Sequence, residues 1–164
     1  MPIHYQMQFK NYQIRQATND DIKEIKNIVF NVLKEYGLNP SEEGKDIDLN
    51  DIETNYINKN GFFGIAIDNN TNALVGTFGL FPLNSETCEL RKMYLVKSAR
   101  GMGLGKFILS TAVEIAKERK FKKMVLETIS PLREAISLYR HFGFKEITPK
   151  EINERVDQAF ELTL

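Results

Sequence analysis

Hydrophobic positions along the chain follow two different periods, which predicts a mixture of helices and strands. One apolar stripe recurs at helical spacing through the positions Ile22, Ile25, Ile28, Val29, Val32, Leu33 and Tyr36. Thr18 and Asp21 match a capping box in front of this stripe, and Gly37 follows it as a stop signal. The pattern therefore predicts a helix over residues 22–36, preceded by a first strand over residues 12–17.

The rest of the chain predicts short strands around two further long helices. Apolar runs bounded by turn residues predict strands over residues 62–67, 74–81, 87–96, 123–128, 144–147 and 159–164. Helical spacing predicts a short helix over residues 51–58 and longer helices over residues 104–120 and 131–142. This order predicts a single domain over residues 1–164, of the mixed α/β class. Its central sheet has about seven strands, mostly antiparallel, with helices on both faces.

Composition narrows the classes of function. The 164 residues carry 22 basic and 22 acidic side chains, so nothing in the totals indicates nucleic acid or a membrane as a partner. A single cysteine, Cys88, excludes an internal disulfide framework and fits a reducing compartment. Two histidines and one cysteine form no zinc-binding pattern, so we expect no metal. With no signal-like or membrane-spanning apolar run, the sequence predicts a cytoplasmic protein.

A glycine turn at residues 100–106 is the strongest chemical signal. Arg100 and Lys106 flank three alternating glycines, Gly101, Gly103 and Gly105, between a predicted strand and a predicted helix. A strand, a glycine turn and a helix start gather backbone N–H groups around a phosphate. The spacing fits neither the P-loop nor the dinucleotide-binding Gly-x-Gly-x-x-Gly pattern.

Four segments together resemble the GNAT N-acetyltransferase superfamily. Residues 100–105 read Arg-x-x-Gly-x-Gly, and residues 135–144 read Ala-x-x-x-Tyr-x-x-x-Gly-Phe. Residues 89–95 match the family's central strand, and residues 126–128 match its next strand. The resemblance covers nearly the whole chain from Tyr12 onward. It implies the GNAT fold, acetyl-CoA as co-substrate, and direct transfer of the acetyl group to a primary amine in a ternary complex, without a metal.

Acetyl transfer to an amine makes demands that these residues could meet. An alkyl ammonium has a pKa near 10.4, so only about one molecule in a thousand is neutral at neutral pH. Glu89 lies eleven residues before Arg100, where some family members place a general base. The alternatives are that ordered water removes the proton from the amine, and that Glu89 simply pairs with Arg91. By the same resemblance, Tyr139 is the general acid that protonates the coenzyme A thiolate; core packing is its alternative role.

The resemblance also assigns the cofactor-binding residues. The backbone of Met93, Tyr94 and Leu95 is expected to pair with the pantetheine arm, and the N–H of Leu95 is expected to face the thioester oxygen. The Arg100 side chain is expected to hold the pyrophosphate together with backbone N–H groups from Gly101, Met102, Gly103, Leu104, Gly105 and Lys106. Leu132 stands where family members often carry an asparagine that contacts the pantetheine.

The acceptor is not readable from the sequence, although balanced charge favours a small molecule. An acidic loop containing Glu42, Glu43, Asp46 and Asp48 is expected either to attract a cationic amine or to be a solvated surface loop. His141 and Cys88 are expected to be a solvent-facing residue and a buried filler, respectively. The apolar C-terminal run at residues 160–164 could be an exposed sheet edge that pairs in a homodimer. A non-catalytic acyl-CoA-binding module, another acyl-CoA donor and a protein amine remain as alternatives.

Overall fold

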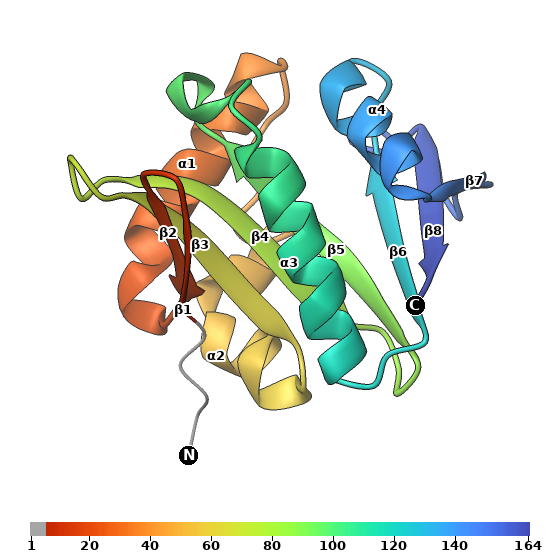
Figure 1. Ribbon diagram of the computed structural model, residues 1–164. Coiled ribbons are helices and arrows are strands. Elements are labelled where there is room, and N and C mark those ends of the chain that lie inside the picture. The colour runs from red at the N-terminus through yellow and green to blue at the C-terminus, as the bar shows by residue number, and fades with distance from the viewer. Residues whose placement is uncertain (1–5) are drawn as a thin grey trace.

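The computed structural model describes residues 6–164 as one mixed sheet with helices on both faces (Figure 1). The strands are β1 Gln6–Phe9, β2 Tyr12–Gln16, β3 Phe62–Asp68, β4 Leu74–Pro82, β5 Thr87–Leu95, β6 Lys123–Thr128, β7 Lys145–Ile147 and β8 Gln158–Thr163. The helices are α1 Ile22–Glu35, α2 Ile52–Asn55, α3 Leu104–Glu118 and α4 Arg133–Phe142. The predicted α/β class and mostly antiparallel sheet are confirmed.

The eight strands lie in the order β1-β2-β3-β4-β5-β6-β8-β7. All neighbours are antiparallel except β5 and β6. The β1 strand was not predicted, because its four residues contain only two apolar side chains, Met7 and Phe9. Phe9 nevertheless stacks on Phe107 of α3 with ring centroids 4.6 Å apart, which fixes this edge strand over the helix.

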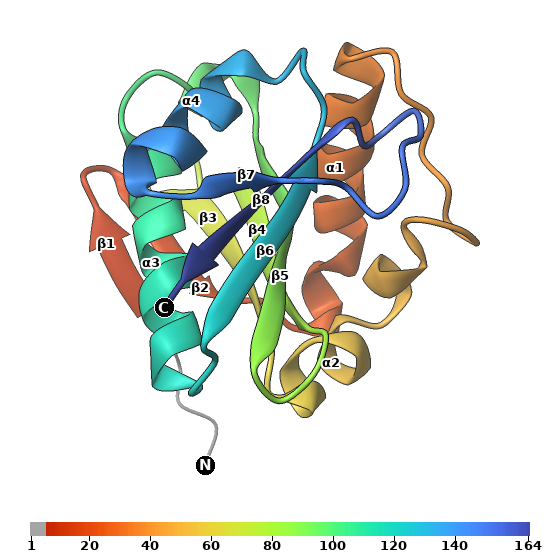
Figure 2. The same cartoon turned by 90° about the vertical axis from the view of Figure 1, so that its right-hand side faces the viewer.

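The sheet separates two apolar cores. The 90° view shows α1 and α2 on one side of the sheet and α3 and α4 on the other (Figure 2). The α1 stripe buries Ile25, Val29 and Leu33 against one face, together with α2. The α3 and α4 helices pack on the other face, where Ile108, Ala112 and Ile136 are among the buried residues. Since helical stripes must cover apolar sheet faces, this two-sided arrangement follows from the sequence pattern.

The predicted capping box is present, and it caps the 3-10 turn Asn19–Asp21 that leads directly into α1. The Thr18 hydroxyl accepts a hydrogen bond from the backbone N–H of Asp20, and the Asp21 carboxylate accepts one from the backbone N–H of Thr18. Gly37 and Gly143 both have left-handed φ angles just beyond α1 and α4, as expected for helix C-terminal glycines. Local signals therefore define the helix ends well.

The prediction of an exposed C-terminal edge is wrong for the first part of residues 160–164. The β8 strand pairs with β6 on one side and with β7 on the other, and Phe160 is fully buried. The chain turns back after α4 so that the three-residue β7 strand becomes the edge. The β7 strand pairs only with residues 159–161, so Leu162 and Thr163 have no partner on that side among the described strands, and the homodimer stays a prediction.

A β-bulge in β5 and the short β5–β6 ladder open the sheet at its centre. Arg91 pairs with Gly79 and Tyr94 with Thr77, so Lys92 and Met93 face a single residue of β4. Lys92 has a φ of 54°, and its carbonyl accepts a 2.7 Å hydrogen bond from the Thr77 hydroxyl. Such a bulge bends the strand. The parallel β5–β6 ladder ends after the third pair, Glu89↔Val125, and the two strands then diverge (Figure 1).

Candidate functional site

The end of β5, the glycine turn, α1 and α4 border a cavity of about 340 Å³, called here the donor cavity. Eight of the predicted cofactor-binding residues line it: Met93, Tyr94, Leu95, Arg100, Gly101, Gly103, Gly105 and Lys106. The predicted general acid, Tyr139, also lines it. Met102 and Leu104 do not, because the Met102 side chain is exposed to solvent and Leu104 is fully buried in the core. Only the backbone of these two residues can contribute to binding.

The glycine turn leads into α3, and the first residues of this helix have backbone N–H groups without helical acceptors. The first helical hydrogen bond runs from the N–H of Phe107 to the carbonyl of Gly103, which leaves the N–H groups of residues 104–106 without helical acceptors. Gly103 has a φ of 86° at the N-cap, a conformation that glycine adopts without strain. The turn therefore presents several donors and the positive end of a 15-residue helix at one end of the donor cavity.

Arg100 makes contacts that the sequence did not predict. Its Nε and Nη2 donate hydrogen bonds of 3.0 and 2.9 Å to the carbonyl of Leu95, and its Nη1 lies 2.7 Å from a carboxylate oxygen of Glu35. These contacts tie the glycine turn to the end of β5 and to α1. Arg100 thus fixes the position of the turn while its side chain still lines the donor cavity.

Tyr139 lies on α4 with its ring in the core. The ring packs near Phe144 and Phe160, with centroids 5.8 and 6.1 Å away, and the side chain is buried. Among residues 6–164, no hydrogen bond involves its hydroxyl. Burial, and then the neighbouring Tyr94, raise the pKa of Tyr139 well above its usual value. The phenol therefore keeps its proton at any working pH and has it free to donate.

A second cavity, of about 330 Å³, adjoins the first and is called here the acceptor cavity. The two cavities share six lining residues: Val32, Tyr36, Met93, Tyr94, Leu132 and Tyr139. The acceptor cavity is further lined by Glu89, Arg91 and Lys92 of β5 and by Glu127 of β6. The two cavities therefore adjoin at these residues, with the glycine turn lining the first and a group of charged side chains lining the second.

Glu89 lies in the acceptor cavity, and its carboxylate is paired with the Arg91 guanidinium on the same face of β5. This pairing was the alternative role for Glu89. The Arg91 guanidinium also lies over the Phe81 ring, with its central carbon 3.8 Å from the centroid. Arg91 is thereby held between the Glu89 carboxylate and the Phe81 ring. In this position it fixes the Glu89 side chain in the lining of the acceptor cavity.

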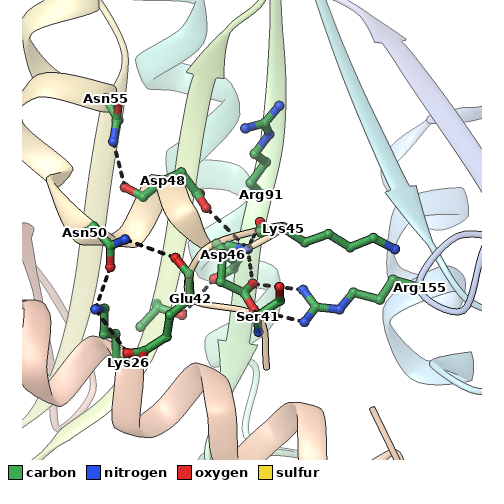
Figure 3. A network of polar contacts seen from close by, with 12 residues as sticks. Lys26, Ser41, Glu42, Lys45, Asp46, Asp48, Asn50, Asn55, Arg91 and Arg155 are labelled. Carbon is green, nitrogen blue, oxygen red and sulfur yellow. Dashed lines mark hydrogen bonds and ion pairs between the residues drawn. The ribbon is translucent and has the colours of Figure 1, made fainter. Parts of the chain in front are cut away.

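Three distant segments meet in a buried ionic network beside this cavity (Figure 3). Asp46, in the loop after α1, is fully buried. Its Oδ1 lies 2.6 Å from the Nζ of Lys92 and 2.8 Å from the Nη1 of Arg155, which precedes β8. Burial alone would raise the pKa of Asp46, but hydrogen bonds from Arg155 and Lys92 outweigh it and hold the pKa far below its usual value.

The hypothesis that the acidic loop attracts a cationic acceptor is wrong for its buried members. Asp46 is neutralised by Lys92 and Arg155, and Asp48 receives a hydrogen bond from the Tyr56 hydroxyl and lies 3.6 Å from Lys92. Glu42 pairs with Lys26 on the surface, 3.3 Å away. From the residues between Glu42 and Asp48, only Lys45 lines the acceptor cavity, so this loop contributes a cation there.

Sequence reasoning missed Glu127, Lys45 and Arg155. Glu127 lies two residues after Val125, which pairs with Glu89, so the β5–β6 register places both carboxylates on the same face of the sheet. Partial burial, and then the Glu89 carboxylate, raise the pKa of Glu127 above its usual value. Arg155 lies 109 positions from Asp46 in the sequence, so no local pattern could have paired them.

Two other candidates behave as expected. Cys88 points to the face opposite Glu89 and is fully buried, and burial raises the pKa of its thiol to about 12. His141 is exposed near the end of α4, where its Nδ1 lies 2.9 Å from the carbonyl of Ser137. Neither residue lines the donor or acceptor cavity. Leu132, the departure from the family pattern, lines both and adds an apolar wall.

Within residues 6–164, no helix has the length and apolar character needed to cross a membrane.

Comparison with known proteins shows the family of the chain and agrees with the fold. A model of the Acetyltransferase (GNAT) family matches residues 27–144. The uncharacterized N-acetyltransferase YjgM of Escherichia coli (strain K12) is 35% identical over 137 residues, which cover 82% of this chain and 82% of that protein.

Solved structures agree as well. An acetyltransferase of the GNAT family from Staphylococcus aureus Mu50 superposes with a TM-score of 0.84 at 26% identity, covering 93% of this chain and 98% of that one. A GNAT phosphinothricin acetyltransferase from Sinorhizobium meliloti, solved in complex with acetyl-CoA, superposes with a TM-score of 0.73. It is 21% identical and covers 94% of this chain and 89% of its own, so that likeness concerns the fold alone.

Proposed function

The chain belongs to the GNAT family and is an N-acetyltransferase that uses acetyl-CoA; from this premise we propose that it acetylates the primary amine of a small molecule by direct transfer in a ternary complex. One observation carries the proposal: the donor and acceptor cavities meet at Met93, Tyr94 and Tyr139. An amine in one cavity can therefore reach an acetyl thioester in the other without a covalent enzyme intermediate.

The residues of the donor cavity fit acetyl-CoA. The three unbonded N–H groups at the start of α3, together with Lys106, suit the pyrophosphate. The exposed backbone of β5 at residues 93–95 suits the pantetheine arm, because β5 and β6 no longer pair there. The bound thioester supplies the acetyl group, and the N–H of Leu95 is proposed to donate to its oxygen.

Glu89 and Tyr139 are proposed to move the two protons of the reaction. Glu89, directly or through an ordered water, accepts the proton that the amine loses as its nitrogen bonds to the acetyl carbon. Tyr139 donates its phenolic proton to the departing sulfur, since its hydroxyl is uncommitted at the junction of the cavities. Arg91 is proposed to hold Glu89 in place.

The direct test is calorimetric titration with acetyl-CoA, followed by a screen of amines for coenzyme A release. We expect acetyl-CoA to bind and at least one small-molecule amine to stimulate the release of coenzyme A. Acetylation of protein amines alone would overturn the small-molecule proposal. Absence of acetyl-CoA binding would overturn the assignment of the donor cavity.

A Gly103→Val variant is expected to bind acetyl-CoA about ten- to a hundredfold more weakly. The left-handed φ of Gly103 strains a β-branched residue by about 1–3 kcal/mol, although the nearest side-chain atom, Cζ of Phe9, would lie 3.5 Å from the new Cβ. Relief of this strain moves the N–H groups of the turn. Calorimetry measures the effect, and Gly143→Val, at φ 109° outside both cavities, is the strain-matched control. Equal acetyl-CoA affinity in both variants would contradict the assignment of the turn.

A Glu89→Gln variant is expected to lose about a hundredfold in kcat, the lower end of general acid–base contributions. The acidic limb of the pH–rate profile should disappear, because that limb reports protonation of the base. Glu86→Gln, in the turn before β5, is the control, since its partner is the exposed Lys122. An unchanged rate with an unchanged acidic limb would assign proton removal to ordered water instead.

A further inference from the structure

The charges that line the acceptor cavity are largely compensated by one another. Glu89 is paired with Arg91, and Lys92 and Arg155 share the buried carboxylate of Asp46. Figure 3 shows the terminal nitrogens of Arg155 directed at Asp46. These groups form the wall of the cavity, and most of their charge is already satisfied.

Two exposed lining charges of opposite sign form no ion pair with any other residue among residues 6–164. The Nζ of Lys45 donates a 2.8 Å hydrogen bond to the side-chain oxygen of Asn153, which is a neutral acceptor. Within residues 6–164, the Glu127 carboxylate makes no hydrogen bond or ion pair. Lys45 comes from the loop after α1 and Glu127 from β6, so the two charges lie on different walls of one cavity.

A buried donor in the same cavity also lacks an acceptor. Both terminal nitrogens of Arg155 are bonded, but its Nε is buried without a hydrogen-bond partner among the described residues. The Arg155 side chain is only 12% exposed. A buried unsatisfied N–H is rare and costs free energy, so it indicates that an acceptor atom from a ligand belongs beside it. The Lys45 Nζ and the backbone N–H of Arg155 both donate to the side-chain oxygen of Asn153, and all three residues line the acceptor cavity.

We propose that the acceptor is an amino-carboxylate, a small molecule carrying a primary amine and a carboxylate. Its carboxylate lies against Lys45 and Arg155, and its amine lies against Glu127. Because this identifies the acceptor of the transfer, it rests on the proposed function. A diamine would leave Lys45 facing a like charge, and a substrate without a cation would leave the Glu127 carboxylate without a counter-charge. Only a molecule with both charges matches both walls.

The amine end is placed beside the chemistry by this orientation. Glu127 is close enough to Glu89 for the two carboxylates to interact, and both line the cavity that reaches Tyr139. Arg91, Lys150 and Glu151 are the other charged groups that act on Glu127. An ammonium group between two carboxylates is bound in a defined place. It loses one proton to solvent when it becomes the neutral amine, and a second to Glu89 as its nitrogen bonds to the acetyl carbon.

The first test compares the common α- and ω-amino acids with the carboxamide of each, using acetyl-CoA and the wild-type protein. We expect at least one amino acid to be acetylated, with a KM about ten- to a hundredfold lower than that of its carboxamide. That range corresponds to one charge-assisted hydrogen bond. Carboxamides or diamines used as well as the amino acids would overturn the proposal.

The second test removes each charge in turn. Lys45→Gln should raise the KM of the amino acid about tenfold or more and leave the KM of its carboxamide unchanged. Glu127→Gln should raise both, because both substrates carry the amine. Lys23→Gln and Glu43→Gln, at exposed positions outside both cavities, are matched controls and should change neither. If Lys45→Gln weakened both substrates equally, Lys45 would not bind the carboxylate.

Titration with acetyl-CoA separates this proposal from the proposed function. If acetyl-CoA binds and other amines are acetylated while amino acids are not, the amino-carboxylate is overturned and the transferase proposal stands. If acetyl-CoA does not bind, both are overturned together.

Discussion

Tyr139→Phe is expected to lower kcat by about 10²–10⁴-fold, the usual contribution of a positioned general acid. The substitution keeps the ring that packs near Phe144 and Phe160 and removes only the hydroxyl. Because that hydroxyl has no hydrogen bond within residues 6–164, its loss leaves no partner unsatisfied. The affinity for acetyl-CoA and the free energy of unfolding should therefore stay close to the wild-type values.

Two matched variants isolate the role of this phenol. Tyr12→Phe changes a buried tyrosine of β2 outside both cavities and should leave kcat unchanged. Tyr94→Phe removes the other phenol shared by the cavities; burial raises its pKa to about 12. If Tyr94→Phe lost activity and Tyr139→Phe kept it, the role of general acid would belong to Tyr94. Full activity in both would assign the proton to solvent.

The sequence predicted the elements whose signals are local. The apolar stripe of α1, its capping box and the stop at Gly37 all depend on residues within a few positions of one another. The same holds for the glycine turn and for the opposite faces of Cys88 and Glu89. The donor cavity was therefore largely predictable, because one strand, one turn and two helix segments supply it.

The acceptor cavity was not predictable, because its charges depend on contacts between distant segments. The acidic loop suggests an anionic surface until Lys92 and Arg155 are seen to neutralise Asp46. Similarly, the C-terminal strand is an edge in sequence order but an interior strand in the sheet. Periodicity indicates which face of an element is buried, whereas strand order and ion pairing are set by the whole fold.

Asp46→Asn is expected to lower the free energy of unfolding by about 3–5 kcal/mol, the usual cost of removing one partner from a buried ion pair. The Lys92 and Arg155 side chains are only 10% and 12% exposed, so both cations would remain buried without their carboxylate. Denaturant unfolding measures this loss. Asp20→Asn, at an exposed position of the first turn before α1, is the control and should change stability by less than about 0.5 kcal/mol.

The loss caused by Asp46→Asn should depend on pH in one direction. The pKa of Asp46 is lowered in the folded state, so its stabilising contribution is present above the unfolded pKa near 3.9. Below that pH the unfolded chain binds a proton that the folded chain does not, and the wild-type protein loses the contribution. The difference between the wild type and Asp46→Asn should therefore be constant above about pH 5 and shrink toward pH 3. A difference that grows on acidification would contradict the direction of this pKa shift.

A triple variant distinguishes unpaired charge from lost packing. Replacing all three groups with apolar residues of similar size, as in Asp46→Leu with Lys92→Met and Arg155→Met, removes both cations together with the carboxylate. Such replacements are often neutral or stabilising, so the triple variant should recover most of the stability that Asp46→Asn loses. It should still fail to use amino-carboxylates normally, since Arg155 is gone from the acceptor cavity. A triple variant no more stable than Asp46→Asn would mean that the single substitution acts through the shape of the loop and not through the two cations.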